Sequence, residues 1–208
     1  QIDSYLADLS LMANVEALAQ TISQNHDRLD VMINNAGILR STDGFTKDGL
    51  DLRFAVNTFA PYLLTQRLMP LLGAESRVIN LSSAAQSPVD MEALAGRTEI
   101  PDQLKAYAQS KLALTMWSNS MANSLANKGL VFVAANPGSL LATKMVKEGF
   151  GMAGKDIGIG ADILVRAALS DEFATASGEY FDNDSGQFTS PHSDALDPQK
   201  SQEMVRVI

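Results

Sequence analysis

The sequence contains no cysteine, so no disulfide can link its segments and no thiolate can bind a metal. His26 and His192 are the two histidines; they lie far apart in the sequence without neighbouring ligand residues, and we expect no metal site. No apolar run approaches the roughly 20 residues that a membrane-spanning helix needs. The net charge of −8 disfavours a nucleic-acid partner, because phosphates bind basic surfaces. A cysteine-free chain favours a reducing compartment, so we predict a cytoplasmic protein.

The remaining composition predicts one α/β domain over residues 1–208. With 208 residues and 46% hydrophobic content, the chain is long and apolar enough to bury a core. Short apolar runs alternate with longer helical patterns, which is typical of a parallel α/β sheet. We predict strands at 4–7, 31–33, 78–81, 130–135 and 178–181, and helices at 10–26, 47–72, 103–127 and 163–169. Residues 141–160 read as irregular, and the polar tail from Asp182 reads as a surface segment.

The most informative motif is Tyr107-Ala108-Gln109-Ser110-Lys111. Residues four apart on a helix share one face, so Tyr107 and Lys111 are expected to lie together. A nearby cation favours the phenolate and lowers the pKa of a tyrosine towards neutrality. Tyr107 is therefore a candidate general acid or base. The structural alternative is a buried tyrosine beside a solvated lysine.

Other polar residues follow the predicted strands or interrupt a helix. Ser82 and Ser83 end one strand, Asn35-Ala36-Gly37 ends another, and Asn136-Pro137-Gly138 follows a third. Ligands of open α/β sheets bind at the carboxyl ends of the strands. Asn57 stands inside an apolar helical segment, where asparagine is unfavourable without a specific partner. Turn capping by the serines and plain burial of Asn57 are the structural alternatives.

Together these motifs resemble the short-chain dehydrogenase/reductase family, in its retinol-dehydrogenase-like branch. The resemblance implies a Rossmann-like doubly wound sheet and hydride transfer between NAD or NADP and an alcohol or carbonyl substrate. It implies catalytic roles for Tyr107, Lys111, Asn57 (through a relay water) and Ser83, which it favours over Ser82. It also implies cofactor contacts, which are listed here: Asp8 and Leu9 with adenine; Asn35, Ala36, Gly37, Tyr107 and Lys111 with ribose; Pro137, Gly138 and Leu140 with nicotinamide.

One part of that family's pattern has no counterpart in the sequence. No glycine-rich turn follows an early strand, although such a turn normally seats the cofactor pyrophosphate on a helix N-terminus. We therefore expect an N-terminally incomplete Rossmann fold that lacks its first βαβ unit. Two other functions stay open: a non-catalytic binding or regulatory protein, and a related epimerase or dehydratase.

The substrate and the assembly are also predicted. The segment after Pro137 is rich in apolar side chains, so we expect an apolar small-molecule substrate; these residues are Leu140, Leu141, Met145, Val146, Phe150 and Met152. The predicted helix 103–127 carries more apolar residues than one core-facing stripe requires. They are Leu112, Leu114, Met116, Trp117 and Met121. We therefore predict a homodimer or homotetramer that packs through this helix and 51–72.

Overall fold

The computed structural model describes residues 2–208 and contains one five-stranded sheet in the order β1-β2-β3-β4-β5. The strands are β1 (Leu29–Asn34), β2 (Leu72–Leu81), β3 (Val131–Asn136), β4 (Tyr180–Asp182) and β5 (Gln187–Thr189). β1 to β4 pair in parallel, and β5 pairs antiparallel with β4. The predicted α/β class and parallel sheet are confirmed.

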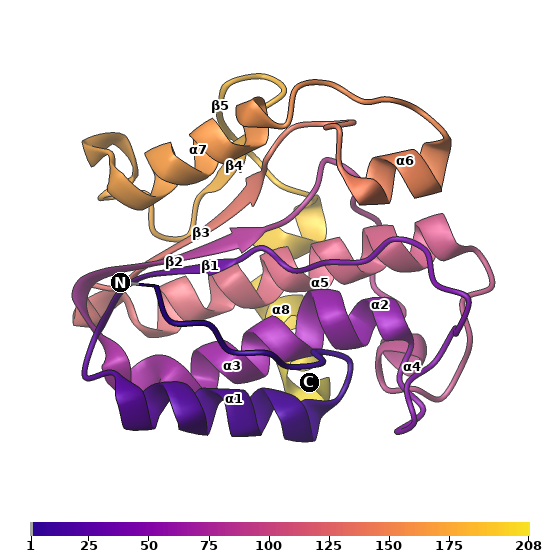
Figure 1. Cartoon of the computed structure of the whole chain (residues 1–208), viewed down its shortest axis with the longest axis horizontal. Helices are drawn as coiled ribbons and strands as arrows, with labels where there is room; N and C mark the ends of the chain where they lie inside the picture. Colours follow the sequence, from indigo (N-terminus) through magenta and orange to yellow (C-terminus); the bar gives the residue numbers. More distant parts are fainter. Residues whose placement is uncertain (1) are drawn as a thin grey trace.

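Helices cover both faces of this sheet (Figure 1). One face carries α1 (Met12–Asn25), α3 (Ala60–Leu68), α5 (Gln103–Ser124) and α8 (Pro198–Val207), together with the short α2 (Leu52–Phe54) and α4 (Met91–Leu94). The other face carries α6 (Lys144–Phe150) and α7 (Gly158–Leu169). The shorter turns are a π-helix at Ala55–Phe59 and 3₁₀ turns at Met69–Leu71, Ala126–Lys128, Asp171–Phe173 and Ser193–Leu196. The fold is therefore doubly wound.

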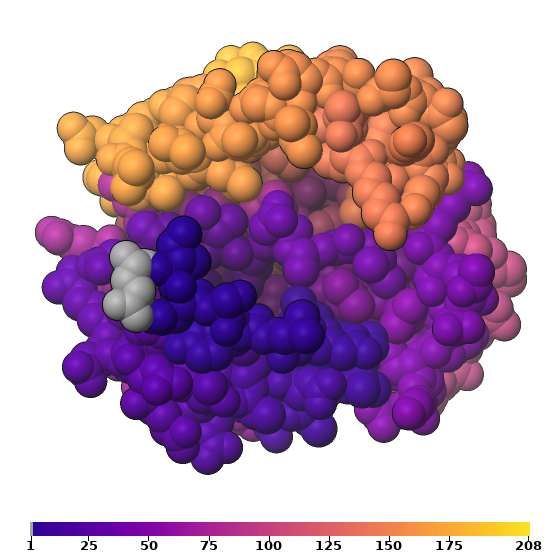
Figure 2. Space-filling view, in the orientation of Figure 1, coloured from indigo at the N-terminus to yellow at the C-terminus, as the bar shows by residue number. Residues whose placement is uncertain are grey.

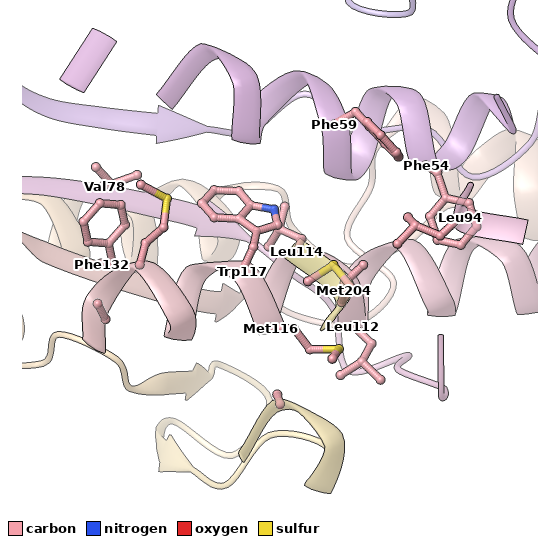
Figure 3. Packing of buried hydrophobic residues seen from close by; sticks show 14 of the residues in the cluster. Phe54, Phe59, Val78, Leu94, Leu112, Leu114, Met116, Trp117, Phe132 and Met204 are labelled. Carbon is pink, nitrogen blue, oxygen red and sulfur yellow. The ribbon is translucent and has the colours of Figure 1, made fainter. Parts of the chain in front are cut away.

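Two hydrophobic cores result from the alternation of side chains along the strands. Val78 and Phe132 face the core under α5, whereas their neighbours Ile79 and Val133 face the core under α7. Successive strand residues point to opposite faces, so a strand buried on both sides reads as a continuous apolar run. Trp117 lies at the centre of the first core (Figure 3). Both faces of the sheet are consequently rigid supports for the loops at its carboxyl edge.

The apolar residues on which the predicted interface was based are covered within the chain, although Leu104 in the first turn of α5 is 44% exposed. Leu112, Leu114, Met116, Trp117 and Met121 are at most 6% exposed. The sheet, the α2–π–α3 segment, the 193–196 turn and α8 surround this helix. The premise of the predicted interface, an exposed apolar face on α5, is therefore wrong.

The predicted strand at 4–7 does not form. These residues are extended but pair with no strand, and the Leu6 side chain is fully solvent-exposed. The segment lies over α1 instead, where it bounds a cavity of about 710 Å³ with Asn14, Ala17, Leu18 and Thr21. A strand needs a hydrogen-bonded neighbour, and among residues 2–208 β1 pairs with β2 alone.

The predicted helix 47–72 starts later and is interrupted. It begins at Leu52, after Asp51 caps it by accepting from the Arg53 N–H, and β2 begins at Leu72. The π-helix at Ala55–Phe59 ends shortly before Pro61, which lies in the first turn of α3. Proline has no N–H to donate to the preceding turn, and a wider turn accommodates that loss.

Two segments are more regular than the sequence suggested. Residues 141–160 contain α6, which Thr143 caps and Gly151 ends in the left-handed conformation, and the start of α7. The tail after Asp182 forms β5 and α8, and α8 buries Met204 against α5. Asp197 caps α8 and Pro198 occupies its first turn, a start signal that the sequence displayed. Among residues 2–208 no helix is long and apolar enough to cross a membrane.

Candidate active site

The predicted catalytic residues and Gly37 meet at the carboxyl edge of the sheet. Gly37 follows β1, Ser83 follows β2, and Tyr107 and Lys111 lie on α5. A methyl group built on Gly37 would lie 3.3 Å from both Asn57 Oδ1 and Lys111 Nζ. Glycine at position 37 therefore lets β1 approach the other two side chains closely.

Lys111 is almost completely buried, at 4% exposed. Its Nζ donates to the Leu81 carbonyl oxygen at 2.7 Å and lies 5.8 Å from the centre of the Tyr107 ring. Burial disfavours the charged ammonium and lowers the pKa of Lys111 to about 8. This side chain consequently changes charge much closer to neutral pH than an exposed lysine does.

Tyr107 behaves differently from the expectation. Burial raises the pKa of its phenol above the ordinary value, and a hydrogen bond with the Ser83 side chain opposes that rise. The expected fall of the pKa through Lys111 is wrong for this structure. The spacing places Lys111 on the same helix face, but its ammonium bonds the Leu81 carbonyl while burial disfavours the phenolate. Tyr107 is thus protonated at neutral pH and able to donate.

The two consecutive serines have different partners. Ser82 points into the core, where its Oγ bonds Thr115 Oγ1 at 2.7 Å and the Lys111 carbonyl at 3.2 Å. Ser83 Oγ accepts from the Ala85 N–H at 3.1 Å and bonds Tyr107. The Ser83 hydroxyl therefore contacts both the Ala85 amide and the Tyr107 phenol. The turn capping considered as an alternative is present together with the contact to Tyr107.

Asn57 is fully buried within the π-helix. Its Oδ1 accepts from the Ile38 N–H at 2.8 Å, and its Nδ2 donates to the Ile38 carbonyl and to Ser110 Oγ, both at 2.9 Å. The amide thus joins the loop after β1 to α5 between Tyr107 and Lys111. These three bonds are the specific reason for an asparagine inside this helix, while the predicted relay water stays a prediction.

The loop after β3 is fixed by two carboxylates, Asp182 at the end of β4 and Asp184 after it. Asn136 Nδ2 donates to Asp182 at 2.7 Å and to Asp184 at 2.8 Å. Ser139 donates to Asp184 through both its N–H and its hydroxyl. In the same loop Gly138 has φ +124° and Leu140 has φ +57°, and the latter value is unusual for a branched side chain. The three residues predicted to contact nicotinamide, Pro137, Gly138 and Leu140, therefore sit in a constrained loop.

The remaining predicted cofactor residues lie nearer the surface. Asp8 is exposed, and hydrogen bonds from the Ser10 hydroxyl and N–H lower the pKa of its carboxyl group. Leu9 is half-buried beside it, and Asn35 and Ala36 are exposed after β1. None of their hydrogen bonds reaches Tyr107, Ser83 or Lys111, so the structure brings only Gly37 of this group into the polar cluster.

The segment containing α6 and α7 lies over the site from the other side. Met145 Cε would lie 3.9 Å from a methyl group on Gly37, so α6 reaches the polar cluster. Leu141 and Val146 are buried, whereas Phe150 and Met152 are about half exposed. Figure 2 shows the surface hollowed between this segment, in orange, and the body of the molecule below it. Apolar side chains therefore border one side of the recess.

Three residues of this region were absent from the sequence-based prediction. Tyr180 on β4 donates to the Ser83 carbonyl at 2.9 Å, Gln86 donates to the same oxygen at 3.1 Å, and Asp184 holds the loop after β3. A polar residue shortly after a strand was the available signal for Asp184, whereas Gln86 lies deeper in the loop after β2. No local sequence signal pointed to Tyr180, because a tyrosine in an apolar strand is also typical of an ordinary core residue.

Comparison with known proteins agrees with this geometry. Residues 1–153 match the family model described as short chain dehydrogenase, and the chain belongs to that family. It is 31% identical to human retinol dehydrogenase 13 over 193 residues, which are 84% of this chain and 58% of the relative. It is 38% identical to the bovine dehydrogenase/reductase SDR family member 13 over 138 residues, 63% of this chain and 36% of the relative. The predicted family and its retinol-dehydrogenase-like branch are confirmed.

Solved structures share the fold. An uncharacterised protein from Mycobacterium paratuberculosis has a TM-score of 0.80 at 25% identity and covers all of this chain, which spans 74% of that one. An NADPH-bound carbonyl reductase from chicken fatty liver has a TM-score of 0.63 at 25% identity, with 89% of this chain and 75% of that chain covered. The chain spans about three fifths of the length of the retinol dehydrogenases that it matches.

Proposed function

We propose that this protein is an NAD(P)-dependent oxidoreductase that acts on an apolar alcohol or carbonyl compound. The observation that carries the proposal is the cluster of Tyr107, Ser83, Lys111 and Asn57 at the carboxyl edge of the sheet. Family membership and the NADPH-bound reductase with the same fold support the cofactor. The apolar border formed by α6 supports the substrate class.

Each residue of the cluster has a different proposed role. A bound nicotinamide supplies or accepts the hydride. Tyr107, with a raised pKa, is a protonated donor at neutral pH and delivers a proton to the substrate oxygen in the reducing direction. Ser83, which contacts Tyr107, can donate its hydroxyl to the same oxygen and stabilise charge that develops there. Asn57 fixes the loop after β1 against α5 and so maintains the spacing between them.

The test is Tyr107→Phe in the full chain, measured with NADH and NADPH at millimolar concentration against apolar aldehydes and ketones. Turnover should fall below detection while the cofactor dissociation constant changes less than about twofold, because the phenol serves the chemical step. Tyr62→Phe is the matched control, since Tyr62 contacts Gln66 and Trp117 away from the site. Wild-type turnover in Tyr107→Phe would refute the proposed role.

A non-catalytic binding protein is the second candidate. Wild-type protein that turns over no carbonyl compound at saturating cofactor would support this candidate and exclude the first.

Assembly and localisation are proposals as well. Because the apolar face of α5 is covered, the proposed homodimer or homotetramer would pack through exposed apolar side chains around α7. These are Ile157, Ile159, Val165 and Leu169. Light scattering at micromolar concentration tests it, and a monomer would refute it. A cytoplasmic location rests on the cysteine-free composition, and imaging of the tagged full-length protein would test it.

A further inference from the structure

The carbonyl oxygen of Ser83 accepts two side-chain hydrogen bonds. Tyr180 donates its hydroxyl at 2.9 Å, and Gln86 donates its Nε2 at 3.1 Å. Tyr180 lies 97 residues away along the chain and is only 6% exposed. A contact over this separation joins β4 to the end of β2, two strands that are not neighbours in the sheet.

The hydroxyl of Tyr180 has no evident packing role. Phe181, its neighbour on β4, points to the opposite face of the sheet and packs there with Phe173 and Phe188. Phenylalanine at position 180 would supply the same ring as tyrosine and lack only the hydroxyl. Burying a phenol oxygen is unfavourable unless it is hydrogen-bonded. Burial also raises the pKa of Tyr180, so it stays protonated and remains a donor.

The Ser83 turn is held at two points. The Ala85 N–H fixes the Ser83 hydroxyl at 3.1 Å, and the bonds from Tyr180 and Gln86 fix its carbonyl. Gln86 is anchored in turn, since its Oε1 accepts from the His192 N–H at 3.2 Å. The C-terminal part of the chain therefore sets the peptide plane after Ser83, and with it the direction of the Ser83 side chain.

We propose that Tyr180 is a positioning residue, whose hydroxyl orients the Ser83 turn so that the Ser83 hydroxyl faces Tyr107 and the substrate oxygen. The inference rests on the proposed function. Tyr180 itself touches neither reacting atom; it acts through Ser83. Misplacement of a catalytic group by about 1 Å can reduce a rate by up to about a hundredfold.

The first test compares Tyr180→Phe with Tyr62→Phe, which also removes one phenol oxygen. Tyr180→Phe should lower kcat about tenfold and change KM less than twofold, because one neutral hydrogen bond is lost and only the chemical step depends on it. Tyr62→Phe should leave kcat within twofold of wild type. Equal kcat values for the two variants would overturn the inference.

The second test is a double-mutant cycle with Ser83→Ala. If Tyr180 acts through the Ser83 hydroxyl, Tyr180→Phe should reduce turnover no further once that hydroxyl is removed. A tenfold further loss in the Ser83→Ala background would show that Tyr180 acts by another route.

A third measurement needs no turnover and so separates this inference from the proposed function. Hydrogen exchange of the Ala85 amide should be at least fivefold faster in Tyr180→Phe, because this amide donates to Ser83 Oγ within the same turn. Tyr62→Phe should leave it unchanged. Unchanged protection in Tyr180→Phe would refute the positioning role, whereas an inactive wild type with faster exchange in the variant would refute only the proposed activity.

Discussion

Lys111 is a buried cation, so its removal should change how the stability of the protein depends on pH. The pKa of this lysine falls from 10.5 to about 8 on folding because burial disfavours the ammonium. The unfolded chain therefore binds more protons than the folded one between these two values. Below pH 8 the buried charge lowers the free energy of unfolding by its full cost, and the free energy of unfolding increases as the pH rises towards 10.5.

The magnitude follows from the shift. One pKa unit corresponds to about 1.4 kcal/mol, so at pH 7 the cost is ~3 kcal/mol. At pH 9.5 Lys111 is neutral in the folded protein, so the cost is only that of removing its proton in the unfolded chain, ~1.4 kcal/mol. Lys111→Met also leaves the Leu81 carbonyl without its donor, but that loss does not depend on pH. The difference in unfolding free energy between wild type and variant should thus change by ~2 kcal/mol between the two pH values, in favour of wild type at the higher one.

Urea unfolding at pH 7 and at pH 9.5, followed by the fluorescence of Trp117, measures this difference. Trp117 is the single tryptophan and is fully buried, so its emission reports loss of the core. Lys105→Met removes an exposed lysine from the same helix and serves as the control. A difference between wild type and Lys111→Met that stays within 0.5 kcal/mol across the two pH values would refute burial of a charged lysine.

Two further predictions concern the loop after β1 and the cofactor. Asn57→Ala should destabilise the protein by ~3 kcal/mol in the same urea assay, since it removes both bonds to the Ile38 backbone and the donor to Ser110 Oγ. The exposed Asn25→Ala should cost under ~1 kcal/mol, and equal losses would contradict the bridging role. Calorimetric titration of the 208-residue chain with NAD and NADP should give millimolar or weaker dissociation constants, because two missing hydrogen bonds to a charged pyrophosphate weaken binding about a thousandfold. Micromolar binding would show that other groups hold the pyrophosphate.

The sequence predicted the architecture through strong local patterns. Val78 to Leu81 is apolar except for Asn80, Val131 to Ala135 is apolar throughout, and each lies in a central parallel strand. Gly129, which ends the 3₁₀ turn after α5, adopts φ +71°, a conformation that favours glycine. The weaker signals failed: residues 4–7 resemble a strand but have no partner, and the polar surface of α8 concealed the buried Met204. A strand depends on a neighbour and an amphipathic helix on a matching surface, and neither is encoded locally.

The sequence by itself determined which residues meet, because the carboxyl ends of parallel strands share one edge and residues four apart share a helix face. Tyr107, Lys111, Ser83 and Gly37 follow from that rule. Only the tertiary structure decided how they meet. Ser82 turns into the core and Ser83 does not, Lys111 bonds the Leu81 carbonyl, and burial raises the pKa of Tyr107 where the motif alone predicted a fall. Tyr180 reaches Ser83 across 97 residues of sequence. The burial of Tyr107 and this long-range contact both depend on the whole packed chain, so local sequence patterns do not reveal them.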